Sequence, residues 1–286
     1  MNYAALIQNR KSVREFRDKV VPFKLMAQIK SYYQNSVRRL IPGIDTELYL
    51  FGTDTREALE GAAGYNSFLV GAPQYLVLLS AEHPHAHLNA GFMMEDLILK
   101  LTDLELDSCW VTFTDSEQVK EALGIDSELE VAAIVAFGYG VKTTRRLRLN
   151  IKSMSNIDII AKRHYFEPKR SVSDLVHRGT WGSHDGLDSA IGFYDDMLWE
   201  SFYAASLAPS YLNRQAYGFV LEAGRVTLVS VPDRFNVPID QELSLGIVLH
   251  HFTVVSENWA GKLSWKLDPQ GLELPHGHRA VASAAI

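Results

Sequence analysis

The sequence predicts an α+β protein built from two related halves. Short apolar runs bounded by breakers, such as "TELYLFG" and "YLVLLSA", indicate strands. Two longer runs at helical spacing, "NAGFMMEDLILKLTDLEL" and "LSLGIVLHHFTVVSEN", indicate long helices. An internal repeat is the third observation. Gly91 and Gly246 are 155 positions apart (246 − 91), and so are Trp110 and Trp265 (265 − 110).

The first half, expected over residues 1–160, opens with a short helix "ALIQ" and an extended segment "SVREF". The next helix, "PFKLMAQIKSYYQNS", begins near Pro22. Later, "SEQVKEALGI" has helical composition, with Ser116 as its expected cap and Gly124 as its stop. A buried strand, "EVAAIVAFGYG", then runs into a glycine turn.

The second half is expected over residues 161–286, because residues 150–180 are polar and mixed. "DMLWESFYAAS" indicates a helix, while "YGFVLEA" and "RVTLVSV" indicate strands. "IKSYY" (29–33) also lines up with "WESFY" (199–203), 170 positions later. We expect the two halves to pack about a pseudo-two-fold axis as one compact unit.

The composition is that of an ordinary soluble globular protein, with 47% hydrophobic and 22% charged residues among 286. A net charge of −6 argues against a nucleic-acid binder. No run approaches the roughly 20 apolar residues of a membrane span. One cysteine, no secretory leader and no such span together predict a cytoplasmic protein.

Three polar positions stand out in "NRKSVREF" (9–16). In an extended chain, alternate side chains point the same way, so Arg10, Ser12 and Arg14 would line one side. Such a row suits a phosphate or an electron-rich ring. The alternative is a solvated charge run after a short helix.

A second polar segment, "APSYLNRQAYGF" (208–219), follows the first helix of the second half. Pro209 and Ser210 favour a turn, and Asn213 and Gln215 supply amide donors and acceptors. These amides could bind a ligand or merely brace the turn. If the halves pack about a two-fold axis, this turn and the cationic row could face one ligand.

Other patterns favour structural over functional interpretations. "HPHAH" (83–87) and "HGH" (276–278) lack a completing carboxylate or cysteine, so no metal site is predicted. Cys109 beside Trp110 indicates a buried, inert thiol, and the two repeated tryptophans indicate core. "FGYG" is too short for a dinucleotide fingerprint.

The chain resembles the nitroreductase-like FMN flavoproteins. The family's Arg-x-Ser-x-Arg segment matches "RKSVR" (10–14), and its Pro-Ser-x-x-Asn-x-Gln turn matches "PSYLNRQ" (209–215). Segments such as "YNSFLVGAPQYLVLLS" and "AIVAFGYG" follow in the family's order over nearly the whole chain. In the family the two motifs usually meet from different subunits of a homodimer. This chain therefore resembles the fused form, in which one polypeptide makes both halves.

The resemblance implies an FMN site and a role for each matching residue. Arg10, Ser12 and Arg14, with Lys11, would contact the pyrimidine edge, the ribityl chain and the phosphate. The backbone of Thr112 and Phe113 would lie near the reactive nitrogen. The remaining implied contacts are Asn66 at the pyrimidine edge, Arg146 and Arg148 on the phosphate, and Pro209, Ser210 and Asn213 from the other half, with Gln215 supporting the turn.

Three departures from the family pattern concern the substrate side and the stoichiometry. Gln215-Ala216-Tyr217 replaces Gln-Pro-Trp, and "ELDSCWV" replaces a glycine-rich approach. "HRGTWGSH" (177–184), placed where the second half would carry its own row, lacks a second arginine. We therefore expect one flavin per chain.

The implied activity is an FMN-dependent NAD(P)H oxidoreductase. NADH or NADPH would donate hydride, and a quinone, nitroaromatic or similar small molecule would accept it in ping-pong kinetics. No side chain is expected to act as a catalytic acid or base. The expected form is a monomer without nucleic-acid or membrane partners. The alternatives are an FMN-binding or cofactor-free relative without turnover, and a different flavin chemistry on the same scaffold.

Overall fold

The computed structural model describes residues 1–65, 68–141, 145–153, 156–163, 168–184 and 196–286. They form two compact units. Unit 1 comprises Met1 and Asn9–Glu167, and unit 2 comprises Asn2–Gln8 and Pro168–Ile286. The division expected after residue 160 lies inside a strand, Asn156–Arg163. That the two halves together make one compact body stays a prediction.

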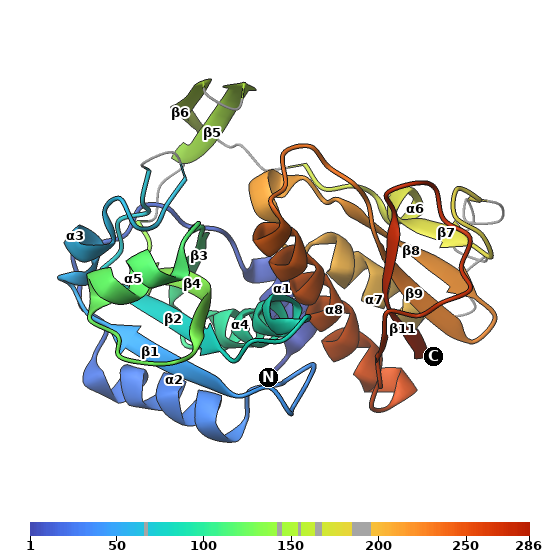
Figure 1. The fold of residues 1–286 in the computed structure, drawn as a ribbon, viewed down its shortest axis with the longest axis horizontal. Coiled ribbons are helices and arrows are strands. Elements are labelled where there is room, and N and C mark those ends of the chain that lie inside the picture. Colours follow the sequence, from blue (N-terminus) through green and yellow to red (C-terminus); the bar gives the residue numbers. More distant parts are fainter. Residues whose placement is uncertain (66–67, 142–144, 154–155, 164–167, 185–195) are drawn as a thin grey trace. The chain divides into compact units, whose positions relative to one another are not determined.

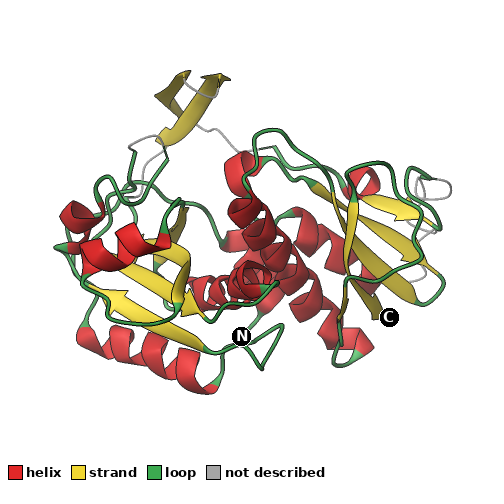
Figure 2. Ribbon diagram, in the orientation of Figure 1, coloured by secondary structure: helices red, strands yellow, loops and turns green. Residues whose placement is uncertain are grey.

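Unit 1 alternates helices and strands along the chain (Figures 1 and 2). Its helices are α2 (Phe23–Asn35), α3 (Thr55–Leu59), α4 (Ala86–Asp103) and α5 (Ser116–Leu123). Its strands are β1 (Thr46–Phe51), β2 (Gln74–Ser80), β3 (Asp107–Val111), β4 (Glu130–Gly138), β5 (Arg145–Ser153) and β6 (Asn156–Arg163). β5 and β6 pair with each other as a separate two-stranded sheet. This hairpin was missed in the sequence, where its polar residues suggested a boundary region.

The main sheet of unit 1 has the strand order β1-β2-β4-β3, and every neighbouring pair is antiparallel. β2 is buried along its whole length, as its unbroken apolar run predicts for a central strand. α2 and α4 pack against each other and against the sheet, and α3 and α5 form a second helical pair.

The N-cap of helix α5 lies one residue earlier than expected. Asp115, not Ser116, is the N-cap, and its carboxylate accepts a hydrogen bond from Gln118 N at 3.1 Å. The Ser116 hydroxyl instead accepts from Val131 N at 2.7 Å, which ties the helix to β4. Gly124 ends the helix in the left-handed conformation (φ 63°), as its position predicts.

Unit 2 begins with the N-terminal helix α1 (Tyr3–Asn9), whose Tyr3 ring contacts the His250 ring edge-on at 6.0 Å. Its other helices are α6 (Val172–Leu175), α7 (Asp196–Ser206), the 3₁₀ turn η2 (Tyr211–Asn213) and α8 (Pro238–Ala260). Its strands are β7 (Val176–Arg178), β8 (Tyr217–Glu222), β9 (Arg225–Ser230), β10 (Lys266–Leu267) and β11 (Arg279–Ala285). The sheet order is β10-β11-β9-β8-β7.

The two units share one topology, which confirms the α+β class and the two related halves. Read from β8, the second sheet runs β8-β9-β11-β10, which repeats β1-β2-β4-β3 in both spatial order and chain order. A long helix links the second and third strands of each set: α4 in unit 1 and α8 in unit 2. Gly91 lies in α4 and Gly246 in α8, so the first repeat anchor falls on matching helices. Trp110 lies in β3, and Trp265 directly precedes β10.

The long helices are the most buried helices of the described structure. In α8 every residue from Leu243 to Ser256 is buried, and in α4 so is every residue from Leu88 to Leu99. A helix that is apolar all round belongs in a core, so the polar residues inside it require an explanation. The ionisable ones are Glu95 and Asp96 in α4, and His250 and His251 at the positions 155 residues later in α8. No described helix is long and apolar enough to cross a membrane.

Candidate functional site

The cationic row adopts the extended conformation expected for its segment. Ser12 forms a parallel bridge with Ser108 of β3, and Val13 N donates to Ser108 O at 2.9 Å. Further on, Phe16 bridges to Gly140 beyond β4. The segment therefore lies along the sheet as an added short strand, and its side chains alternate.

Arg10 forms an ion pair with the buried carboxylate of Glu95. Its Nε lies 3.5 Å from Glu95 Oε1, and the two side chains are 8% and 0% exposed. The second carboxylate oxygen of Glu95 accepts a hydrogen bond from Trp110 Nε1 at 3.1 Å. Arg10 Nε is a buried donor without a hydrogen bond, so its contact with Glu95 is an ion pair only. One residue of α4 thus joins the row to β3.

The other two side chains of the row have open donors. Ser12 and Arg14 are partly buried, and no described residue forms a hydrogen bond or ion pair with either side chain. Lys11, between Arg10 and Ser12, is exposed. Partly buried donors that no protein group uses suit an anionic ligand, because only water has to be displaced from them.

Cys109 shows that both arginines of the row lie near β3. Burial raises the pKa of the Cys109 thiol, and the positive charges of Arg14 and Arg10 partly oppose that rise. The thiol is 5% exposed and stays protonated at neutral pH. The structure thus confirms that Cys109 is buried. That the thiol is unreactive stays a prediction.

The chain after β3 meets a glycine turn. Gly64 N donates to Thr112 O at 2.7 Å, and Ala63 bridges to Phe113, which is buried. A side chain at Gly64 would place its Cβ 2.5 Å from Phe68 O, so this close approach needs glycine. Thr112 and Phe113 therefore continue the strand beside which the row lies. Asn66 lies outside the described residues.

Arg146 and Arg148 lie in β5, opposite Lys162 and Ile160 of β6. The structure describes the backbone of this hairpin, and the arginine side chains lie outside its described part. Their expected role on a phosphate stays a prediction.

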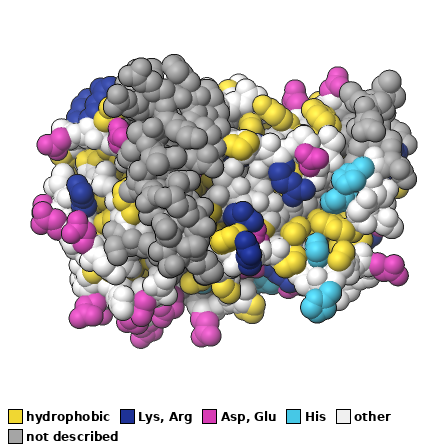
Figure 3. Space-filling model, turned by 90° about the horizontal axis from the view of Figure 1, so that it is seen from above, with side chains coloured by type: hydrophobic (Ala, Val, Ile, Leu, Met, Phe, Trp, Pro, Cys, Tyr) yellow, Lys and Arg dark blue, Asp and Glu magenta, His cyan; other side chains and the backbone are white. Residues whose placement is uncertain are grey.

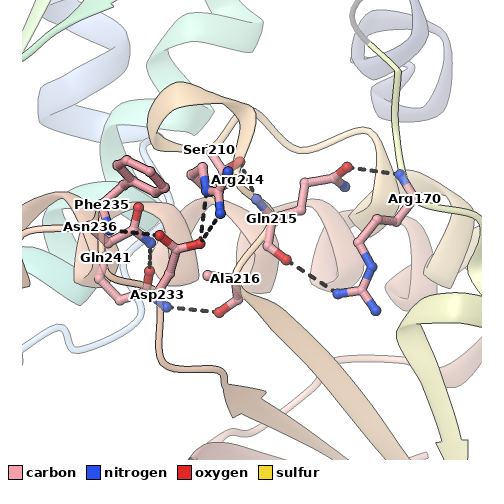
Figure 4. A network of polar contacts seen from close by, with 9 residues as sticks. All are labelled: Arg170, Ser210, Arg214, Gln215, Ala216, Asp233, Phe235, Asn236 and Gln241. Atoms are coloured by element: carbon pink, nitrogen blue, oxygen red, sulfur yellow. Dashed lines mark hydrogen bonds and ion pairs between the residues drawn. The ribbon is translucent and has the colours of Figure 1, made fainter. Parts of the chain in front are cut away.

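In unit 2 the polar turn is held by hydrogen bonds of its own side chains (Figure 4). Gln215 Oε1 accepts from Arg170 N at 2.8 Å, and the Arg170 guanidinium donates back to Gln215 O at 3.4 Å. Gln215 Nε2 donates to Ser206 O at 2.9 Å and to Tyr217 Oη at 3.2 Å. Both polar atoms of this buried amide are therefore used inside the unit, which favours the bracing role.

Asn213 is also engaged within unit 2. Its Oδ1 accepts from Lys169 Nζ at 2.8 Å, and its Nδ2 donates to Pro168 O at 2.8 Å. Ser210 differs, because its Oγ accepts from Gln215 N at 2.9 Å and its own proton is not used by any described residue. Pro209 is buried. Of the three polar residues predicted in this turn, Ser210 is the one whose side chain donates to no described residue.

The turn stores backbone strain. Leu212, Asn213 and Gln215 have φ values of 48°, 55° and 48°, in the left-handed region that glycine prefers. Such strain persists only where surrounding contacts enforce it, and the hydrogen bonds from Lys169 and Arg170 do so here. Tyr211 N also donates to Ser244 Oγ of α8 at 3.1 Å.

Sequence reasoning missed three residues that shape these two segments: Glu95, Lys169 and Arg170. Glu95 had a readable signal, since a carboxylate inside the apolar run "GFMMEDLILKL" must find partners on burial. Lys169 and Arg170 had none, because their partners lie about 45 residues away in the sequence.

Two further features of the described residues are their possible metal ligands and their surface charge. No group of three or more His, Cys, Asp or Glu among these residues could hold a metal ion. Figure 3 shows lysine, arginine, aspartate and glutamate side chains interspersed on the face that it displays, without a large basic patch among the side chains drawn in colour.

Comparison with known proteins identifies the family. A family model described as "Putative TM nitroreductase" matches residues 2–169. No curated protein matches the chain. A solved structure described as a "putative nitroreductase (tm1586)" from Thermotoga maritima MSB8 is 17% identical, with a TM-score of 0.60. The match covers 100% of this chain and 94% of that one. At this identity the likeness shows the fold alone.

Other similar structures cover about half of the chain. A nitroreductase family protein from Clostridium novyi NT is 18% identical, covering 49% of this chain and 87% of that one, with a TM-score of 0.43. An "FMN-dependent Nitroreductase" from Clostridium difficile R20291 is 18% identical over 48% and 87%, with a TM-score of 0.42. The family model spans more than half of the sequence, and the full-length match has the same fold. The chain therefore belongs to the nitroreductase family that this model describes.

Proposed function

We propose that this chain is an FMN-dependent oxidoreductase that takes hydride from NADH or NADPH and passes it to a quinone, a nitroaromatic or a similar acceptor. Membership of the nitroreductase family supports the oxidoreductase class. The observation that carries the cofactor proposal is the extended row beside β3. There the Arg14 guanidinium and the Ser12 hydroxyl are partly buried and lack a partner among the described residues.

The residues of the row fit FMN chemically. Arginine presents a planar fork of donors that matches phosphate oxygens, and a serine hydroxyl suits a ribityl chain. Bound FMN would supply the hydride chemistry, and the protein would supply position and charge. Arg10 and Arg14 would bind and orient the anionic and electron-rich parts of the cofactor, with Ser12 between them.

The predicted site residues outside the row support this proposal less directly. We assign Asn213 and Gln215 to bracing the turn, since their amides are used within unit 2. Ser210 keeps an open proton and is the residue of that turn which we propose for FMN. Contacts from the remaining predicted residues stay predictions: Lys11, Asn66, Thr112, Phe113, Arg146, Arg148 and Pro209. A monomer in the cytoplasm, without nucleic-acid or membrane partners, likewise stays a prediction.

Cofactor binding is tested by titrating FMN into cofactor-free protein and following flavin fluorescence. Arg14→Ala should weaken binding about 10- to 100-fold, because a charged hydrogen-bonding group is worth roughly 1.5–3 kcal/mol. The matched control is Arg17→Ala, which removes the same charge three positions along, from an exposed side chain. Equal loss in both variants would show a general charge effect, and no binding by the wild type would reject FMN.

Turnover is tested separately. With NADH or NADPH and a quinone or nitroaromatic, initial rates should give parallel double-reciprocal lines, because each substrate would react in turn at one place. Intersecting lines would reject the ping-pong order. A protein that binds FMN but oxidises neither nicotinamide would favour the alternative without turnover.

A further inference from the structure

Glu95 is an ionisable side chain that the family resemblance leaves unassigned. It lies in α4 with no exposed side-chain surface, among residues such as Met94 and Ile98 that are equally buried. Burying a carboxylate is expensive unless charges and donors compensate. Here one oxygen lies 3.5 Å from Arg10 Nε, and the other accepts from Trp110 Nε1.

We propose that Glu95 is a positioning residue, which holds the Arg10 guanidinium in place for the anionic cofactor. This inference rests on the proposed function. The contact engages the Nε side of the guanidinium, and no described residue accepts a hydrogen bond from its terminal nitrogens. Arginine's planar fork can be held at one edge while the other edge binds a ligand, which a lysine ammonium cannot do.

Two physical effects of Glu95 on an anionic ligand have opposite signs. As a negative charge close to Arg10, it lowers the positive potential of the site, so its removal would tighten anion binding. As the partner that keeps a buried guanidinium in place, it preorganises the site, so its removal would weaken binding. The sign of the change in affinity therefore distinguishes positioning from simple charge.

Glu95→Gln is the decisive variant. A glutamine has one acceptor oxygen for two donors, Arg10 Nε and Trp110 Nε1, so its own amide NH₂ must face one of them. We expect FMN affinity, measured by flavin fluorescence, to fall at least about 10-fold. Unchanged or tighter binding would overturn the inference while leaving the proposed function intact. A wild type that fails to bind FMN would overturn both.

The neighbouring residue provides a matched control. Asp96 is equally buried in α4, but its carboxylate accepts from Tyr32 Oη and Arg38 N, both at 2.9 Å. Asp96→Asn removes the same charge from the same helix without touching the row. FMN affinity should change less than about 3-fold in Asp96→Asn. An equal loss in both variants would mean that the effect is structural, which contradicts positioning.

The double variant tests whether Glu95 acts through Arg10. Once Arg10→Ala has been made, adding Glu95→Gln should weaken FMN binding by less than about 2-fold, because the residue to be positioned is gone. A further 10-fold loss would overturn the inference. A second variant, Arg10→Lys, tests the inference without changing the buried Glu95, whose replacement could disturb folding. Arg10→Lys keeps the charge but not the fork, and should also lose at least about 10-fold. Binding as in the wild type would overturn the inference.

Discussion

The two units share one sheet topology but add a different segment to it. Unit 1 lays an extended cationic segment beside β3, and its Arg14 and Ser12 side chains have no partner among the described residues. Unit 2 adds β7 to the opposite edge, where it pairs in parallel with β8, the counterpart of β1. "HRGTWGSH" (177–184) thus begins in β7. It does not occupy the place of the row in the second unit, contrary to our sequence alignment.

A short sequence likeness sharpens this contrast. "KSV" (11–13) and "RSV" (170–172) are offset by 159 positions (170 − 11). In unit 1, Ser12 lies in the extended row. In unit 2, Ser171 caps α6 through a capping box with Asp174. The Arg170 guanidinium donates to Tyr217 O at 3.1 Å, and also to the carbonyls of Gln215 and Asp174.

The difference teaches how a duplicated scaffold can specialise. The same donor chemistry is left open in unit 1 and satisfied internally in unit 2. Satisfied donors stabilise a fold but have little left for a ligand, whereas open donors remain available to bind one. This asymmetry supports the expectation of one FMN per chain more directly than the arginine count does.

The largest expected effect is that two arginine variants lose different properties: Arg170→Ala loses stability, and Arg14→Ala loses FMN binding. Arg170→Ala should lower the free energy of unfolding by about 3 to 5 kcal/mol, because carbonyls, including that of buried Tyr217, lose their donor. Arg14→Ala should lower it by less than about 0.5 kcal/mol while weakening FMN binding. Denaturant unfolding checks both. The contrast between the units fails if Arg14→Ala proves as destabilising as Arg170→Ala.

Buried carboxylates offer the second comparison. Glu95 and Asp96 in unit 1 have donors, whereas no described residue donates a hydrogen bond to the Asp240 carboxylate in unit 2. Burial raises the pKa of Asp240 from 3.8 to about 7. Its contribution to stability is therefore full below pH 3.8 and is lost as the pH rises through 7.

Asp240→Asn should thus be more stable than the wild type at pH 8, by about 3 to 4 kcal/mol, and similar to it at pH 4. Urea unfolding at both pH values measures this difference. A constant difference across pH would show that Asp240 does not titrate in this range.

His177 should act with the opposite sign. Burial, with the nearby charges of His184, Arg170 and His278, lowers the pKa of His177 from 6.5 to about 4. The folded state favours the neutral ring, so this stability is present above pH 6.5 and is lost as the pH falls toward 4. The loss should reach roughly 2 to 3 kcal/mol. His177→Gln should flatten the stability profile between these pH values, and an unchanged slope would assign the loss to other groups.

The smallest effect concerns left-handed turn residues. Unit 1 meets this demand with Gly64 (φ 104°), and unit 2 with Leu212 (φ 48°). Leu212→Asn should raise the free energy of unfolding by about 0.5 to 1 kcal/mol, since asparagine tolerates this conformation better. Gly64→Ala should lower it, because the added Cβ would lie 2.5 Å from Phe68 O. Opposite signs in thermal unfolding support the contrast, and a destabilised Leu212→Asn would argue that packing outweighs strain.

Much of the fold was readable from the sequence because its signals are local or periodic. The long helices follow from apolar spacing, and the repeat anchors Gly91 and Gly246 fall on matching helices. The extended segment "SVREF" was also predicted, and its bridges to Ser108 and Gly140 confirm it. Local signals did not reveal β5 and β6, whose polar composition resembles that of a linker.

The polar environment was less predictable. Asn213 and Gln215 matched a family motif, but only the fold shows that Lys169 and Arg170 engage their side chains. Glu95 was visible as a charge in an apolar run, yet its partner Arg10 is 85 positions earlier (95 − 10). Such long-range pairings depend on tertiary structure, which residue spacing does not encode.

The most direct test of one flavin per chain is the stoichiometry of FMN binding to the purified 286-residue chain. Cofactor-free protein at a known concentration, well above the dissociation constant, would be titrated with FMN while flavin fluorescence and absorbance are recorded. If unit 1 alone keeps its donors open, the titration should break at one FMN per chain and lose its sharp break in Arg14→Ala. A break at two FMN per chain, or no binding at all, would contradict that claim.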